Sequence, residues 1–142
     1  MAKACAVGKV RGFGTVNIYV TGSDAAVSTD VAAKVQEIVA KQRELNVDVL
    51  VVNAQRTACN MSVTVYAEDG YSSSEVKALL SKAFADYVNS IPIGGTFHLA
   101  ELGAKLVATG CINNYTWNTD MQDVTAAKSQ CFTVGTVTIG VK

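Results

Sequence analysis

The chain has 142 residues and a mass of 14.9 kDa, enough to bury about 70% of its extended surface on folding. Hydrophobic residues make up 49% and charged residues 17%, which excludes an intrinsically disordered chain. Twelve basic and twelve acidic side chains cancel. This balance argues against nucleic acid or an anionic membrane as the main partner. No uncharged stretch is long enough to span a bilayer.

The first third of the chain predicts a β-α-β unit. Glycines within residues 12–14 lead into an alternating run at 15–20, which we interpret as an edge strand. Residues 29–30 offer an N-cap to a helix with one apolar face, which fades near residues 45–46. A β-branched strand over residues 47–52 completes the unit.

The second part repeats this order. A strand is predicted at residues 61–66, and residues 72–75 form a capping box in outline. Apolar side chains then recur at helical spacing through residue 88, until residues 91–95 stop the helix at a proline. A shorter helix is predicted at residues 99–107.

The last part of the chain predicts two more strands, at residues 111–117 and 132–141, with a polar loop at 118–130. The whole pattern predicts an α+β fold. We expect two small β-α-β-type modules, residues 1–57 and 58–142, with helices packed on one face of mixed or antiparallel sheets.

The cysteines are far apart and form no C-x-x-C pair; they are Cys5, Cys59, Cys111 and Cys131. The chain has a single histidine, so a zinc-finger pattern cannot be completed. The start of the chain lacks the apolar core of an export signal. We therefore expect reduced, mostly buried thiols and no metal or cofactor, while a bridge between Cys111 and Cys131 is left open.

No pattern in the sequence gathers a nucleophile and its base. His98 precedes a predicted helix and Glu101 lies three residues on, a weak acid–base pattern for which a hydrogen bond at the helix start is the favoured interpretation. Asp120 and Asp123 lack the glycine and closing glutamate of a calcium loop, so a solvated loop is expected there.

Aromatic and apolar residues near the C-terminus form a candidate partner interface. Tyr115 and Trp117 share one face of their predicted strand, which suits either core packing or a protein contact. The last strand carries Phe132 and Val134, and residues 129–141 are uncharged. An edge of that kind pairs with another chain or with a strand of its own fold.

Several segments resemble, in order and spacing, the baseplate J-like family of contractile phage tails. They are residues 14–22 (GTVNIYVTG), 43–52 (RELNVDVLVV), 61–65 (MSVTV), 87–96 (YVNSIPIGGT) leading to 99–102 (LAEL), and 135–139 (GTVTI). The resemblance extends from about Gly12 to the end. Members of this family are considerably longer, so the chain is expected to correspond to their C-terminal part.

The resemblance implies a structural part of the baseplate wedge in a phage, tailocin or related injection machine. In that family, copies pair with one another and with a smaller wedge partner, and wedges surround a central hub. It implies assembly in the host cytoplasm, a place in the virion tail baseplate, and no enzyme activity, cofactor, nucleic acid, membrane-spanning segment or small-molecule substrate. The alternative is a small-molecule-binding or enzymatic α+β domain with its site near His98 and Glu101.

Overall fold

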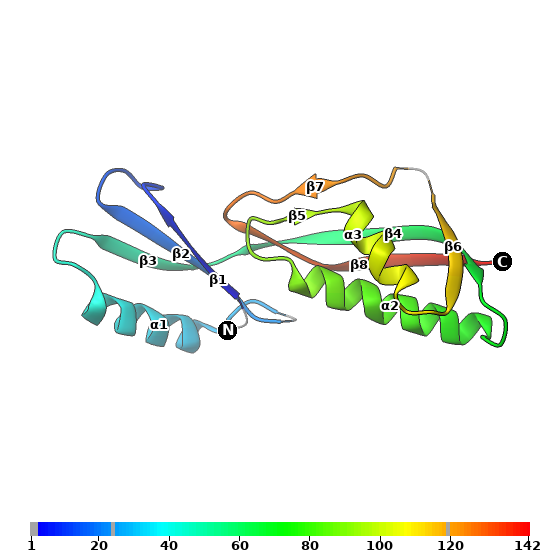
Figure 1. The fold of residues 1–142 in the computed structure, drawn as a ribbon. Coiled ribbons are helices and arrows are strands. Elements are labelled where there is room, and N and C mark those ends of the chain that lie inside the picture. The colour runs from blue at the N-terminus through cyan, green and yellow to red at the C-terminus, as the bar shows by residue number, and fades with distance from the viewer. Residues whose placement is uncertain (1–2, 24, 119) are drawn as a thin grey trace. The chain divides into compact units, whose positions relative to one another are not determined.

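The computed structural model describes residues 3–23, 25–118 and 120–142 (Figure 1). Its helices and strands confirm the predicted α+β class. In chain order the elements are β1 (Lys3–Gly8), β2 (Thr15–Thr21), α1 (Thr29–Gln42), β3 (Asp48–Asn53), β4 (Gln55–Ala67), α2 (Ser73–Ser90), β5 (Thr96–Phe97), α3 (Leu99–Val107), β6 (Ile112–Trp117), β7 (Val124–Thr125) and β8 (Gln130–Val141).

The chain divides into two compact units. Unit 1 is formed by Met1–Arg56, Pro92–Gly95 and Ala126–Cys131, and unit 2 by Thr57–Ile91, Thr96–Thr125 and Phe132–Lys142. Two short segments thus join unit 1 from far along the chain. The division into two modules at residues 1–57 and 58–142 stays a prediction.

Unit 1 contains the predicted β-α-β arrangement with one further strand. β2 pairs parallel with β3 through the α1 connection, and β1 pairs antiparallel with β2. β2 is therefore the central strand, and the prediction of an edge strand at residues 15–20 is wrong. The β1–β2 turn uses left-handed backbone at Gly12 and Gly14, and a Cβ at Gly14 would lie only 3.3 Å from the backbone oxygen of Asn46.

The helix of unit 1 lies on its sheet without burying any side chain completely. Its N-cap is Ser28, one residue before the predicted position, and the Ser28 hydroxyl accepts the Val31 N–H. None of the residues of α1 is buried. The buried cluster of unit 1 consists instead of Tyr19, Ala54, Ile93 and Cys131, so its core draws on the two returning segments.

Unit 2 has the order β6-β4-β8 in its sheet. β6 pairs antiparallel with β4. β8 runs parallel to β4 (Figure 1). The hydrogen bonds of Lys142, just after β8, show this direction: its N–H bonds the Val65 oxygen, and its oxygen accepts the Ala67 N–H. The polar region predicted as a loop at 118–130 includes β7, which pairs with β5.

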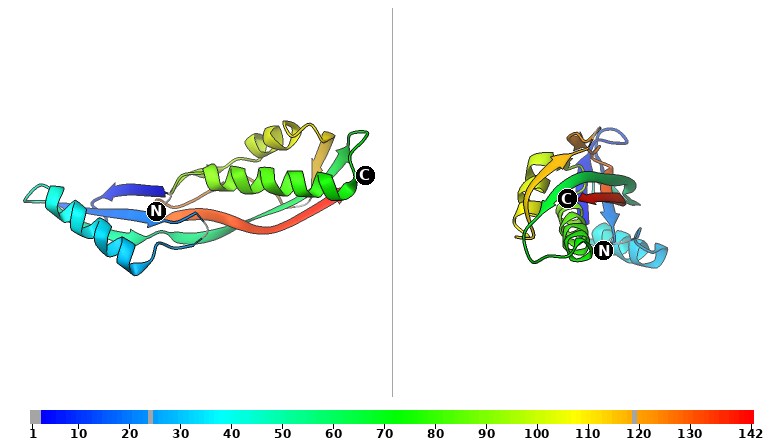
Figure 2. Two further views of the ribbon diagram at one scale, coloured as in Figure 1. Left: turned by 90° about the horizontal axis from the view of Figure 1, so that it is seen from below. Right: turned by 90° about the vertical axis from the view of Figure 1, so that its right-hand side faces the viewer.

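The core of unit 2 is built mainly on α2. The predicted capping box is confirmed: Ser72 and Glu75 each bond the other's backbone N–H, and the helix ends at Ser90, two residues before Pro92. α3 packs against α2 and β6 (Figure 2). The buried residues of α2 are Val76, Leu80, Phe84, Tyr87 and Val88.

Candidate interaction surface

The aromatic pair predicted on β6 is formed. The ring centroids of Tyr115 and Trp117 lie 5.0 Å apart in an edge-to-face arrangement, which is favourable for two aromatic rings. The two residues lie opposite Val65 and Val63 of β4. Both aromatic side chains are half-buried, so each keeps part of its surface in contact with solvent.

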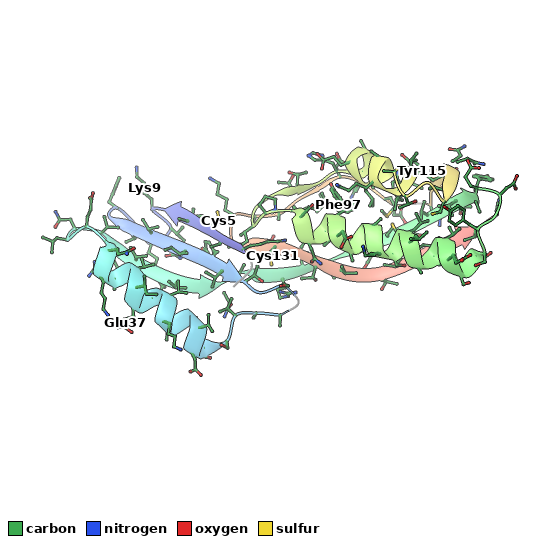
Figure 3. All side chains as sticks on the ribbon, turned by 60° about the horizontal axis from the view of Figure 1, so that its bottom comes forward. Cys5, Lys9, Glu37, Phe97, Tyr115 and Cys131 are labelled. Carbon is green, nitrogen blue, oxygen red and sulfur yellow. The ribbon has the colours of Figure 1, made fainter. Side chains whose placement is uncertain are left out.

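A glycine on α3 fixes the position of this pair. A Cβ built at Gly103 would lie 2.0 Å from the Tyr115 hydroxyl oxygen and 2.6 Å from the adjacent ring carbon. Gly103 is buried, and only a residue without a side chain lets Tyr115 lie this close to the helix (Figure 3). Sequence periodicity gave no signal for this contact, because Gly103 and Tyr115 lie on different elements.

The other two residues of the predicted interface lie in different environments. Phe132 is 3% exposed, and its ring packs edge-on against Phe97 with 6.4 Å between the ring centroids, in the core of unit 2. Val134, two residues later, is 42% exposed. The structure therefore brings Tyr115 and Trp117 together and leaves Phe132 inside, where it supports the surface rather than forming it.

The last strand lies at an edge of its sheet. Within the described residues, β4 is the strand that pairs with β8, and the other side of β8 has no strand beside it. β8 is 12 residues long and carries no charged side chain. From Thr133 to Val141, half-buried and exposed positions alternate and none is fully buried. This surface offers backbone hydrogen-bonding groups and β-branched side chains to a partner.

The region near His98 was the alternative candidate site, and its geometry is that of a helix cap. His98 makes no side-chain cap to α3. Asp123 caps α3 instead, because its carboxylate accepts the Leu99 N–H at 2.9 Å. The same carboxylate contacts the His98 ring nitrogen Nδ1 at 3.0 Å. These two bonds hold the pKa of Asp123 below its usual value. Asp123 is exposed in a segment without helix or strand, as expected, and the imidazole does form a hydrogen bond at the helix start. What the sequence did not predict is that Asp123 is its partner and also caps α3.

Glu101 does not complete an acid–base pair with His98. Its carboxylate accepts a hydrogen bond from the Tyr87 hydroxyl at 3.1 Å, while the same hydroxyl accepts the His98 N–H at 2.8 Å. Burial raises the pKa of Tyr87 above its usual value. The arrangement therefore ties α2 to the start of α3. The walls of the cavities described, of about 200 to 370 Å³, contain neither His98 nor Glu101.

The thiols do not gather into a ligand set. All four cysteines are free, three are buried, and Cys5 is half-buried. Burial raises the pKa of the Cys59 thiol to about 11. Cys131 packs in the buried cluster of unit 1, whereas Cys111 belongs to unit 2. Among the residues described, no three His, Cys, Asp or Glu side chains come together as metal ligands.

A comparison with protein families identifies the chain. The family model for the baseplate J-like protein C-terminal domain matches residues 59–140, more than half of the sequence. The match begins within β4 and ends within β8, so it contains both helices of unit 2. A search of curated proteins found no match. No helix in the described part of the chain has the length and apolar character to cross a membrane. The chain belongs to the baseplate J-like family and is a structural component of a phage tail baseplate.

Proposed function

We propose that this chain is a scaffold module of a baseplate wedge in a contractile phage tail, or in a tailocin or prophage relative. It supports ring assembly through contacts with copies of itself and with other wedge and hub proteins, and it is assembled in the host cytoplasm. The observation that carries the proposal is the family match over residues 59–140, which contains most of unit 2.

The physical character of unit 2 supports a scaffold. Its large side chains are packed with little exposure; Phe84 and Leu80 are both 0% exposed. A core of this kind holds a surface in one shape, as an assembly that repeats the same contact requires. The half-buried pair of Tyr115 and Trp117 and the exposed Val134 lie on that unit. We propose that they contact wedge partners.

The test is a pull-down of the tagged chain from its native source, with co-purifying proteins identified by mass and stoichiometry. Recovery of wedge or hub proteins in fixed ratio is expected. Trp117→Ala should lower that recovery, because Trp and Tyr contribute strongly to interface energies. Leu79→Ala is the matched control, since Leu79 is an exposed apolar residue on α2. Recovery of the chain alone would overturn the proposal.

A second variant separates this proposal from an enzymatic domain. His98→Ala should leave the recovery of baseplate proteins unchanged, because the His98 side chain is 46% exposed and its hydrogen bond is to Asp123, which also caps α3 through the Leu99 N–H. Loss of a ligand or an activity in this variant, with assembly intact, would favour the enzymatic alternative.

A further inference from the structure

The β3 edge of the unit 1 sheet is covered by a side chain of α1. Gln36 of α1 donates its amide N–H to the Val49 oxygen at 2.8 Å and accepts the Val51 N–H at 2.7 Å. Asn53 bonds both the N–H and the oxygen of Val27, at 2.9 and 3.0 Å. The Gln36 amide occupies backbone groups of β3 that an added strand would use, whereas the Asn53 amide holds the segment before α1. Covering an edge in this way prevents unwanted pairing.

Beyond its first residue, where the Gly94 N–H bonds the Gln130 oxygen at 2.9 Å, the outer edge of β8 has none of the usual protections. Short length, prolines and charged side chains commonly block a strand edge. β8 has 12 residues and no charge, and the one proline of the chain is Pro92. Within the described residues, the other strands at sheet edges are shorter, β1 and β6 having 6 residues each.

The hydrogen bonds of Lys142 show which groups of β8 face outward. The Lys142 N–H and oxygen both bond to β4, at 2.9 and 3.1 Å. Backbone groups of successive residues in a strand point to alternate edges. The N–H and oxygen of Val137, Ile139 and Val141 therefore point away from β4. Closer to the start of β8 the pattern changes, because the Thr136 N–H bonds the Asn60 side chain at 2.8 Å.

We infer that residues 136–142 pair antiparallel with the same residues of a second copy, across a twofold axis at Ile139. This inference rests on the proposed scaffold function and names the contact that would join two copies. In this register Ile139 faces Ile139, and Val137 faces Val141. Each facing pair whose groups point outward exchanges two hydrogen bonds. The three-stranded sheets of two copies would then form one continuous sheet.

Charge and side-chain type favour a second copy as the partner. An isologous contact presents the same patch twice, so it must be compatible with itself. The paired register places Thr136 opposite Lys142 and Thr138 opposite Gly140, so no two like charges face each other. β-branched side chains, which fit a pleated surface, occupy the facing pairs at Val137, Ile139 and Val141.

The first test is the association state of the purified full chain, measured by sedimentation over a concentration series. A monomer–dimer equilibrium is expected. Ile139→Pro removes an outward N–H without removing a bond to β4, and proline is tolerated where the N–H faces away from the sheet. This variant should be monomeric with an unchanged circular dichroism spectrum. Thr138→Ala, which keeps every backbone group, is the control and should remain dimeric.

A pair of charge variants tests the register without changing the backbone. Thr136 is exposed, so both substitutions are accommodated. Thr136→Lys places a like charge opposite Lys142 and should weaken the dimer, while Thr136→Glu should strengthen it, each by roughly threefold or more at low salt. High salt should reduce both effects. Equal dimer affinity in both variants would overturn the register.

The outcomes separate this inference from the proposed function. A wild-type chain that stays monomeric, or a dimer insensitive to Ile139→Pro, overturns the β8 pairing. If that chain still recovers wedge or hub proteins in the pull-down, the scaffold function stands without it. A dimer that is lost in Ile139→Pro supports the pairing, even where the wild-type pull-down recovers no baseplate protein.

Discussion

The two longer helices of this chain are both amphipathic, but they take different roles in their units. α2 buries five residues completely, including Phe84 and Tyr87, whereas α1 buries none. Two apolar residues of α1 are exposed, Ile38 at 57% and Val31 at 39%. Helical periodicity thus predicts that a helix forms, but the size of the side chains and of the facing surface decides what it buries.

The difference has a consequence for where stability resides. An open groove of about 300 Å³ lies beside α1 and is lined by Val16, Ile18 and Val39. Beside α2 in unit 2, aromatic rings pack together, with Phe97 in contact with Phe84 and Tyr87. We therefore expect unit 2 to resist unfolding and the α1 side of unit 1 to open more readily.

The largest expected effect comes from emptying the core of unit 2. Phe84→Ala should lower the free energy of unfolding by about 3–5 kcal/mol, because it leaves a cavity among fully buried side chains. Ile38→Ala on α1 should change it by less than about 0.5 kcal/mol. Urea titration followed by circular dichroism and by the fluorescence of Trp117 measures both. Similar losses in the two variants would remove the contrast between the helices.

Glycine-to-alanine substitutions test whether unit 2 is packed more tightly around its backbone than unit 1. Gly103→Ala should destabilise unit 2 by roughly 1–3 kcal/mol, because the new methyl group would overlap the Tyr115 ring. Since Tyr115 contacts Trp117, the emission of that single tryptophan should also shift. Gly8→Ala in unit 1 is the control, because no atom lies within 4 Å of the added Cβ. An unchanged emission spectrum in Gly103→Ala would contradict the contact.

Removing the N-cap residue should cost more stability at α2 than at α1. Ser72→Ala breaks the capping box of α2 and should cost about 1 kcal/mol in the unfolding of unit 2. Ser28→Ala at α1 should leave the Trp117-monitored transition unchanged. No residue of α1 is buried, so fraying of this helix should not disrupt the core of unit 2. Matched urea titrations of the two variants measure the difference. An equal shift would show that α1 and α2 unfold together.

Local sequence signals predicted the helices of unit 2 well, because capping and periodicity are encoded within a few residues. α3 has the predicted bounds, residues 99–107. β1 was missed because its small residues, such as Ala4 and Ala6, give no clear alternation. The burial of Phe132 and the cap from Asp123 were missed for a different reason. Both depend on partners far along the chain, Phe97 and Leu99, which a local pattern cannot identify.

The smallest effect expected is on how stability depends on pH, which should differ between the N-cap of α3 in unit 2 and that of α1 in unit 1. α3 is capped by the carboxylate of Asp123, whereas the Ser28 hydroxyl that caps α1 does not titrate. The Leu99 N–H and His98 lower the folded-state pKa of Asp123. The ionised carboxylate therefore stabilises the folded state above the unfolded pKa, and this contribution is lost as the pH falls through the folded pKa.

Asp123→Asn should therefore flatten the fall in Tm of unit 2 between neutral pH and about pH 3, where Asp side chains titrate. The amide oxygen of asparagine can still accept the Leu99 N–H, so the helix start is kept while the titrating charge is removed. Asp69→Asn, in the turn after β4, is the matched control and should leave the slope of Tm against pH unchanged. If both variants show the wild-type slope, the α3 cap does not depend on an ionised Asp123, and acid would not distinguish the start of α3 from that of α1.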